Sequence, residues 1–163
     1  MNAIDLLVKQ HREVEELFEE LDSAGEDAHE TQERLCREIS DQLAVHAEIE
    51  ERIFYPESRQ PDTAERLRES VEEHLAMKRL LAQIMGDGAE DLRFLARMRV
   101  LEEQVEHHID EEEQELFPKV RRSCSREELE DLGRRMQQLA ERLIEAGEPS
   151  SRIPDQTDRP API

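Results

Sequence analysis

Apolar residues recur at three- and four-residue steps along most of this chain, a spacing that places them on one face of an α-helix. The first such stripe predicts a helix from about residue 3 to Leu21, through Ile4, Leu7, Val14, Phe18 and Leu21. His11 falls on the same face as these apolar residues. The pattern therefore predicts a buried helix face that carries an imidazole.

Two further stripes predict a second and a third helix, both bounded by residues that begin or end helices. The second helix covers residues 35–53, and Pro56 and Pro61 are expected to end it and to frame a turn. The third is expected to begin near residues 62–63, Asp and Thr, whose side chains suit an N-cap. The Gly-Asp-Gly sequence at 86–88 is expected to stop it.

The remaining pattern predicts two more helices and a tail. A fourth helix is expected from about residue 89 to residue 121, with a kink or a tightened turn near Pro118. The sequence at 125–128 has capping-box spacing and predicts a fifth helix that Gly147 ends. Residues 148–163 contain four prolines and are expected to form a disordered tail.

Length and composition favour an all-α fold. The 163 residues suffice for one sizeable core, which all the helices would share. Charged residues make up 39% of the chain and aromatic residues only 3%, which is typical of long amphipathic helices. We therefore expect an antiparallel up-down four-helix bundle over residues 1–121, an accessory C-terminal helix over 122–147 and the disordered tail over 148–163.

The formal net charge of -20 excludes two classes of partner. Such a charge repels nucleic-acid phosphates and anionic membrane surfaces, so neither is expected to bind directly. Cys36 and Cys124 form no CxxC motif and are expected to be free thiols, which fits a reducing compartment. The chain has no signal-peptide pattern and no apolar run of membrane-spanning length, so a cytoplasmic location is expected.

Four histidines interrupt the apolar faces, and two of them begin the same motif. His46 and His108 are each followed four residues later by a glutamate and ten residues later by a proline. Residues four apart lie almost in line on a helix, so each HxxxE motif can direct both side chains at one point. Facing helices of a bundle bring such groups together at the axis. The sequence thus predicts a metal site made of His11, His46, Glu50, His74, His108 and Glu112.

The donor set limits the choice of metal. Imidazole and carboxylate suit iron, manganese, cobalt or zinc, and the missing thiolates argue against a structural zinc site or an iron–sulfur cluster. Two metals bridged by Glu50 and Glu112 would use all six groups. Two divalent ions would also compensate the carboxylates, whose burial in an apolar face is otherwise costly. The simpler alternative for each motif alone is a solvent-facing ion pair between residues four apart.

Other polar side chains near these motifs have simpler interpretations. Tyr55 precedes the first motif's proline and is expected to pack rather than to act as a polar group near a ligand. Lys78, one turn after His74, is expected to extend to solvent. His107 should lie at the boundary of the site or behind its ligands, and His29 is expected to be inert.

These motifs, with the FYP and LFP sequences that follow them, resemble the hemerythrin-like family of HHE cation-binding domains over about residues 1–121. The resemblance implies an antiparallel four-helix bundle with a non-heme di-iron centre. The two glutamates would bridge two Fe ions, the histidines would cap them, and an oxo or hydroxo bridge would complete the cluster. The animal oxygen carriers have a second histidine where Lys78 stands and a carboxylate one residue later, which makes Glu113 a rival to Glu112.

The resemblance implies a cytosolic protein that binds O2, nitric oxide or peroxide for sensing, storage or scavenging. An enzyme that removes nitric oxide or peroxide is an alternative, because an open coordination position and a redox metal permit turnover as well. A ferritin-like ferroxidase fits less well, since those bundles use ExxH motifs. A metal-free helical module that recruits a partner through the fifth helix and the tail remains a further alternative.

Overall fold

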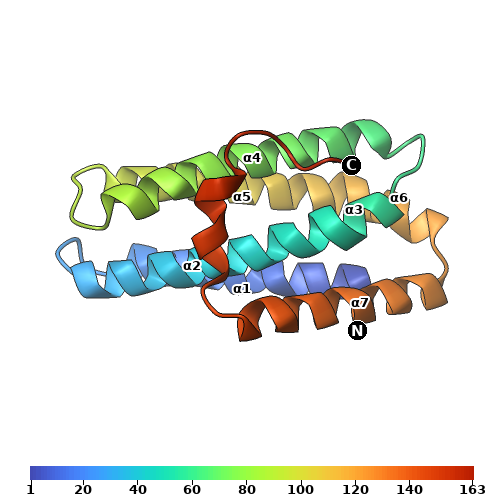
Figure 1. Ribbon diagram of the computed structural model, residues 1–163, viewed down its shortest axis with the longest axis horizontal. Helices are drawn as coiled ribbons and strands as arrows, with labels where there is room; N and C mark the ends of the chain where they lie inside the picture. Colours follow the sequence, from blue (N-terminus) through green and yellow to red (C-terminus); the bar gives the residue numbers. More distant parts are fainter.

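Each predicted apolar stripe forms a helix in the computed structural model, which describes residues 1–163 and contains no strand. The four long helices of the bundle are α1 (Ala3–Ser23), α2 (His29–Ile49), α4 (Ala64–Asp87) and α5 (Phe94–Glu111). Short turns join α1 to α2 and α4 to α5, so consecutive helices are antiparallel, and the two hairpins lie against each other (Figure 1). The all-α and four-helix-bundle predictions are confirmed.

Residues at several helix ends behave as caps, but the predicted N-cap residue Thr63 makes no side-chain cap bond to α4 (Ala64–Asp87). The Asn2 side chain accepts a hydrogen bond of 3.0 Å from the backbone N–H of Asp5 and begins α1. The predicted capping box is present between Ser125 and Glu128, at the start of α7 (Arg126–Glu145). Gly88 and Gly147 have φ of 78° and 79°, a conformation that side chains with a Cβ rarely adopt, and they follow the ends of α4 and α7.

The helix that carries the first HxxxE motif ends at Glu57, between Pro56 and Pro61 as predicted, but its pitch changes before it ends. It continues through a π-helical segment, η1 (Glu50–Phe54), into the short helix α3 (Tyr55–Glu57). The second motif is followed in the same way by η2 (Glu112–Leu116) and α6 (Phe117–Ser123). Near Pro118 the expected tightened turn is therefore a widened one.

The widened turns explain how the helices tolerate these prolines. A proline inside a helix has no N–H to donate and clashes with the carbonyl four residues back. Just before each proline the bonding shifts to the carbonyl five residues back, from Tyr55 to Glu50 and from Phe117 to Glu112. The extra residue in the turn also brings Tyr55 and Phe117 into line with the glutamates, where a regular α-helix would place them elsewhere.

The core is divided into two apolar clusters, whereas the sequence predicted one shared core. One cluster has 18 buried residues and includes the inner face of α7, and the other has 16 and lies toward the α4–α5 turn. The candidate metal ligands belong to neither cluster and lie in a polar layer of the bundle. α7 packs along α1 and α2, so the accessory helix covers part of the first cluster (Figure 1).

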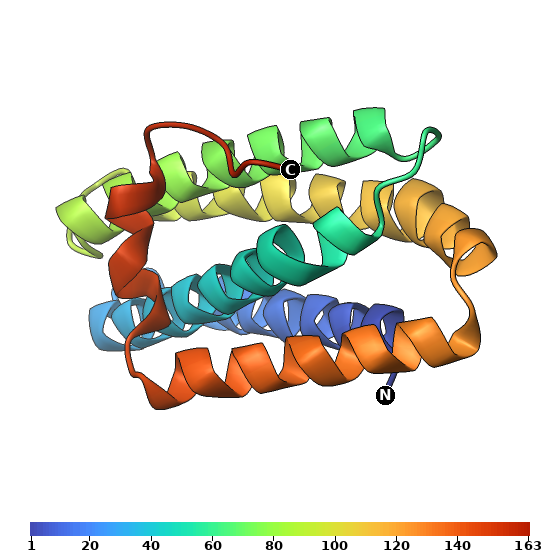
Figure 2. The ribbon, with the colours of Figure 1, turned by 45° about the vertical axis from the view of Figure 1, so that its right-hand side comes forward.

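The predicted disordered tail is ordered, which corrects the sequence-based expectation for residues 148–163. Residues Pro149–Gln156 form a 3₁₀-helix, η3, that crosses α2 and α4 (Figure 2). Ile153 is only 2% exposed and joins the second apolar cluster, and the Ser150 N–H donates to Asp41 at 2.9 Å. Prolines restrict the conformations of the unfolded chain, so this segment loses less entropy when it becomes ordered than a chain without prolines would. These few contacts are therefore enough to hold it in place. We call residues 148–158 the strap.

Two observations bear on the expected cellular setting. Cys36 is buried, Cys124 is partly exposed, and both are free thiols as predicted. Every helix falls short of the combination of length and apolar character that crossing a bilayer requires.

The contact between α7 and the N-terminus predicts a large effect of one small substitution. A Cβ added at Gly133 would lie 2.5 Å from the backbone oxygen of Met1 and 2.8 Å from the backbone nitrogen of Ala3. We expect Gly133→Ala to lower the free energy of unfolding by about 1–3 kcal/mol in urea titrations, because backbone must move. Gly86→Ala is the matched control, since a Cβ there meets nothing within 4 Å. Equal stability of the two variants would contradict the packing of α7 on the N-terminus.

Candidate metal centre

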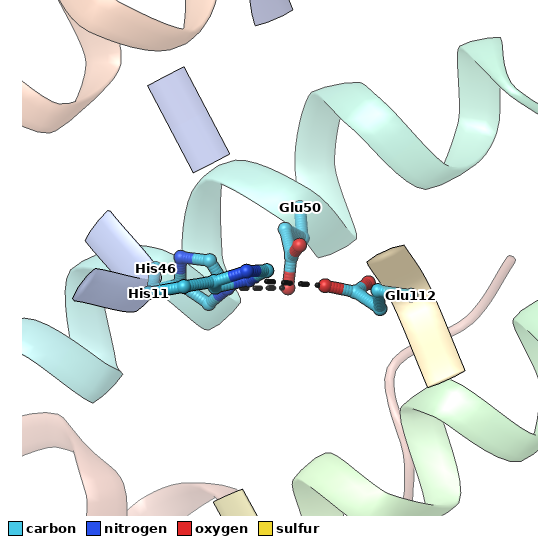
Figure 3. A group of neighbouring side chains, drawn as sticks. All are labelled: His11, His46, Glu50 and Glu112. Atoms are coloured by element: carbon cyan, nitrogen blue, oxygen red, sulfur yellow. Dashed lines mark ion pairs between the residues drawn. The ribbon is translucent and has the colours of Figure 1, made fainter. Parts of the chain in front are cut away.

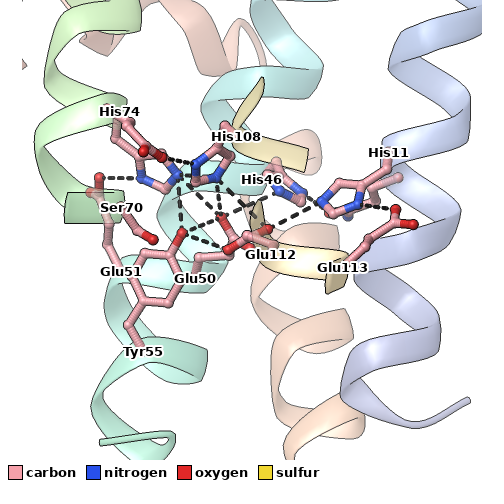
Figure 4. Close-up of polar contacts among 12 residues, drawn as sticks. His11, His46, Glu50, Glu51, Tyr55, Ser70, His74, His108, Glu112 and Glu113 are labelled. Atoms are coloured by element: carbon pink, nitrogen blue, oxygen red, sulfur yellow. Dashed lines mark hydrogen bonds and ion pairs between the residues drawn. The ribbon is translucent and has the colours of Figure 1, made fainter. Parts of the chain in front are cut away.

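Six side chains from all four helices of the bundle converge in its interior, as the HxxxE spacing predicts (Figure 4). All six are buried, and the two glutamates are the first residues of the two π-helical segments. The six are His11 on α1, His46 and Glu50 from the second helix, His74 on α4, and His108 and Glu112 from the helix that begins with α5. The structure thus brings together every residue that we predicted for the site.

The six side chains form two groups that share a carboxylate. In one group, the Nε2 atoms of His11 and His46 each lie 3.3 Å from a glutamate oxygen, of Glu112 and Glu50 respectively (Figure 3). In the other, Nε2 of His74 lies 3.2 Å from Glu50 Oε2 and 3.1 Å from Nε2 of His108. Glu112 Oε2 is also 3.7 Å from His108 Nε2. Each carboxylate therefore lies between one pair of imidazoles and the other.

Every imidazole is held from behind by an acceptor on its other nitrogen. The four Nδ1 contacts are His11 with Glu113 at 2.8 Å, His46 with Gln10 at 2.8 Å, His74 with Glu51 at 2.9 Å and His108 with Glu73 at 2.6 Å. An Nδ1–H that donates outward leaves the Nε2 lone pair directed at the centre, which is the usual arrangement of metal-bound histidines.

The outer contacts distinguish the two rival carboxylates. Glu113 accepts from the back of the His11 ring and pairs with the guanidinium of Arg12 at 2.6 Å, so it lies outside the centre. Glu112 is fully buried and points inward, toward both imidazole pairs. Of the two, Glu112 is the one positioned to share a metal with the histidines.

Four atoms of the centre are buried without a hydrogen-bond partner. These are Nε2 of His11, Nε2 of His46, Oε1 of Glu50 and Oε2 of Glu112. Buried polar atoms are nearly always satisfied, and each unsatisfied acceptor costs about 1–3 kcal/mol. A cluster of acceptors that faces inward without donors is what a cation would satisfy. The nitrogen and oxygen donors present are therefore suited to divalent transition metals.

Without a metal, the charges of the centre perturb its pKa values in opposite directions. Burial lowers the pKa of His46 to about 3, despite the attraction of Glu50. Burial also acts to lower the pKa of His74, but hydrogen bonds to Glu50 and Glu51 outweigh it and the pKa is raised. Burial acts to lower the pKa of His108 as well, but the charge of Glu112 together with hydrogen bonds to Glu50 and Glu73 outweighs it, so the pKa is raised well above its usual value. Protons and metal ions thus compete for the same imidazoles.

Tyr55 is part of the centre, a role that our sequence analysis missed. Its hydroxyl donates to Glu112 Oε1 at 2.9 Å and lies 3.1 Å from Glu50 Oε2 and 3.3 Å from His74 Nε2. Burial, followed by the charges of the two glutamates, raises the pKa of Tyr55 well above its usual value, so the hydroxyl keeps its proton. Regular helical periodicity gave no signal for this position, because the widened turn sets its direction.

An aromatic layer closes the glutamate side of the centre. The Phe117 ring stacks on His11 with ring centroids 5.8 Å apart, and Phe54 packs edge-on against Phe117 at 5.7 Å. The ring of Tyr55 stacks on His74 at 5.5 Å. Water cannot approach the two carboxylates through this buried layer, so any access to the centre is from the histidine side.

The structure also corrects the interpretation of Lys78 and places the two remaining histidines. Lys78 does not extend to solvent: it is only 8% exposed, and its Nζ lies 2.9 Å from both oxygens of Glu51. Glu51 in turn accepts from His74, so the lysine helps to fix a carboxylate behind the centre. His107 lies at the boundary, with a side chain that is 68% exposed, and His29 begins α2 away from the site.

The hydroxyl of Tyr55 allows a test of the polar layer without loss of packing. We expect Tyr55→Phe to destabilise the metal-free protein by about 1–3 kcal/mol, because a buried acceptor on Glu112 loses its donor. Urea unfolding in the presence of a chelator measures this cost. The loss should be smaller in metal-loaded protein, where a cation would satisfy the same carboxylate. No loss in the metal-free protein would contradict the hydrogen bond.

Comparison with known proteins identifies a family and a solved structure that this chain resembles. The family model described as the hemerythrin HHE cation binding domain matches residues 2–120, which contain all six converging residues. A crystal structure of an HHE cation binding domain-containing protein from Mycobacterium kansasii is similar, with a TM-score of 0.76 and 21% sequence identity. The similarity covers 96% of this chain and 99% of that chain. At this identity it shows a shared fold.

Two relatives of known sequence match most of this chain. It is 35% identical over 130 residues to a DNA nickase of Nostoc sp., and 28% identical over 127 residues to an uncharacterized hemerythrin-like protein of Schizosaccharomyces pombe. The matches cover 80% and 76% of this chain but only 36% and 62% of the two relatives. The chain therefore spans less than two thirds of the length of either relative.

Proposed function

This chain belongs to the hemerythrin family of HHE cation-binding domains, and we propose that it is a non-heme di-iron protein that binds O2, nitric oxide or peroxide. Sensing, storage or scavenging of such a ligand is the role that we propose. The convergence of four imidazoles and two carboxylates, with four of their buried acceptors unpartnered, carries the proposal.

In this proposal the six residues divide between two ions. His11 and His46 would hold one ion, His74 and His108 would hold the other, and both ions would share Glu50 and Glu112. The observed grouping supports this division, since each carboxylate lies between the two imidazole pairs. A bound pair of irons supplies two reducing equivalents and open coordination positions for a small ligand.

The surrounding side chains orient the donors and keep water away. Glu51 and Glu73 accept from the backs of His74 and His108, which fixes the ring directions and increases the basicity of Nε2. Lys78 stabilises the charge of Glu51 in its buried position. Tyr55 keeps a proton within hydrogen-bond reach of both bridging carboxylates. These contacts hold the donor side chains in position before any external ligand binds, so the site is pre-organised.

The name of one relative raises DNA as a partner, and the charge of this chain opposes it. A formal net charge of -20 repels phosphates, and this chain spans only 36% of the relative named as a DNA nickase. The proposal therefore includes no nucleic-acid or membrane partner. It places the protein in the cytoplasm, a setting that the two free thiols support.

Metal analysis of protein purified without added metal tests the proposal first. We expect two irons per chain, and the absence of iron, manganese and zinc would instead favour a metal-free interaction module. The reduced protein is then mixed with O2, nitric oxide and hydrogen peroxide in turn. A stable ligand-bound spectrum would support sensing or storage. Repeated turnover of peroxide or nitric oxide would support the alternative, a detoxifying enzyme.

A further inference from the structure

A cavity of about 390 Å³ adjoins the histidine side of the centre. All four imidazoles line it, whereas neither glutamate of the centre does. Figure 4 shows the histidine rings on one side of the two carboxylates and Tyr55 on the other. The cavity is thus the space from which a molecule would reach the centre, because the aromatic layer closes the opposite side.

The size of this cavity exceeds what a diatomic ligand needs. A water molecule occupies about 30 Å³ in the liquid, and O2 or nitric oxide has a comparable number of heavy atoms. Cavities of roughly 300–1,000 Å³ are typical of sites for small organic molecules. The volume found here lies in the lower part of that range. A site that served only a diatomic molecule would leave most of it unused.

The lining indicates the chemistry of an occupant. Half of the 22 lining residues are hydrophobic, among them Val14, Met77, Leu81 and Val105. Three carboxylates of the lining, Glu13, Asp41 and Glu148, oppose an anion. Its cationic groups are already paired with carboxylates outside the lining, Lys78 and His74 with Glu51 and His108 with Glu73. A neutral molecule is therefore favoured over a carboxylate or a phosphate.

One polar atom of the lining lacks a partner. The side-chain oxygen of Gln42 is buried and accepts no hydrogen bond, although Gln42 lies on the cavity wall. Unlike the unpartnered atoms of the centre, it belongs to no metal-ligand group. This oxygen is shielded from the cavity by other atoms of the protein, so it places no requirement on the occupant.

Part of the cavity wall comes from outside the residues that the family model matches. Ile144 lies on α7, whereas Glu148, Pro149 and Ile153 belong to the strap. The strap is anchored by Ile153 and by the bond from Ser150 to Asp41, itself a cavity residue. The strap therefore adds to the wall of a partly open, largely apolar space over a centre that the four helices alone would leave more open.

We propose that this cavity binds a neutral, mostly apolar organic molecule, such as a medium-chain alcohol. Its position beside reactive metals rests on the proposed function, whereas the binding itself rests on the cavity and its lining. The apolar part packs among the aliphatic side chains of the lining. The occupant lies against the imidazole faces, where it shares the space with any small ligand of the metals.

Calorimetric titration with 1-hexanol and with hexanoate tests the site, in both metal-free and iron-loaded protein. We expect saturable binding of one 1-hexanol per chain, at least tenfold tighter than that of hexanoate. Val105→Phe fills the cavity from a position that is 3% exposed, and it should weaken the binding of 1-hexanol at least tenfold. Val100→Phe is the matched control on the same helix, since Val100 is 46% exposed and outside the cavity.

Ala44→Leu, which adds volume at a less buried position of the same lining, serves as a second variant if Val105→Phe does not fold. Absence of saturable binding to both forms of the protein would overturn the proposal, as would hexanoate binding of equal strength. Unchanged affinity in a folded cavity variant would also overturn it. If the protein binds 1-hexanol but no metal, the proposed binding site is supported and the proposed di-iron function is wrong. If it holds two irons but does not bind 1-hexanol, the di-iron function is supported and the binding site is wrong.

Discussion

Replacement of His108 by alanine is expected to lower the metal content from two ions per chain to one or none, and His46→Ala should do the same in the other group. Nε2 of His108 lies 3.1 Å from Nε2 of His74 and 3.7 Å from Glu112, so its loss removes one donor from a pair. The variant also removes the Nδ1 atom that lies 2.6 Å from a carboxylate oxygen of Glu73. Metal analysis and differential scanning calorimetry measure the two effects.

The thermal effect should be large because metal binding and folding are linked. A metal held at a concentration about 1,000 times its dissociation constant stabilises the folded state by about 4 kcal/mol. For a chain of this size, each kcal/mol shifts the midpoint of thermal unfolding by about 2–4 °C. We therefore expect the midpoint of His108→Ala to fall by roughly 10 °C and to become less sensitive to a chelator.

His107→Ala is the matched control for this experiment. His107 is adjacent in sequence, but its exposed side chain contacts only Glu111, at 3.3 Å. Metal content and thermal midpoint should remain those of the unmodified protein. If His46→Ala and His108→Ala also kept both metals, these two positions would be removed from the site.

Glu112→Gln and Glu113→Gln are expected to have very different effects on metal binding. The first replaces an inward carboxylate by a neutral amide, so one negative charge no longer compensates the two ions. We expect it to lose at least one metal even when metal is in excess. The second changes only the acceptor behind His11, and an amide oxygen can still accept from Nδ1. Loss of such an outer partner typically weakens affinity by about 10–100-fold.

Competition with a chelator of known affinity, followed by metal analysis, separates these outcomes. Both variants differ from the unmodified chain by the same chemical change at neighbouring positions, so general effects of lost charge cancel. Retention of both metals in Glu112→Gln together with their loss in Glu113→Gln would exchange the roles that we assign to these two residues.

The sequence was sufficient for most of the bundle and for the six converging side chains. Apolar residues at helical spacing predicted the helices, and the predicted boundary residues Ser125, Gly88 and Gly147 lie at helix ends in the structure. The HxxxE spacing predicted which residues share a direction, because a helix of regular pitch sets the direction of its side chains. Errors arose where the pitch changes, at the widened turns before Pro56 and Pro118.

Contacts between distant segments were the second source of error. Lys78 is buried because Glu51, 27 positions earlier in the chain, lies within 2.9 Å of its Nζ, and no local pattern encodes that distance. The strap is ordered because Ile153 finds an apolar cluster formed by other helices. A local composition rich in proline predicts disorder only when such a partner is absent.

The sequence by itself determined the helices, the acidic surface and the set of six donors, since these follow from local periodicity and side-chain chemistry. Only the tertiary structure decided that Glu112 rather than Glu113 faces inward, that the Tyr55 hydroxyl reaches both carboxylates, and that the strap adds to the wall of a cavity. The physical reason is that periodicity fixes directions along one helix, whereas register between helices and the exact turn before each proline depend on packing summed over residues far apart in the chain.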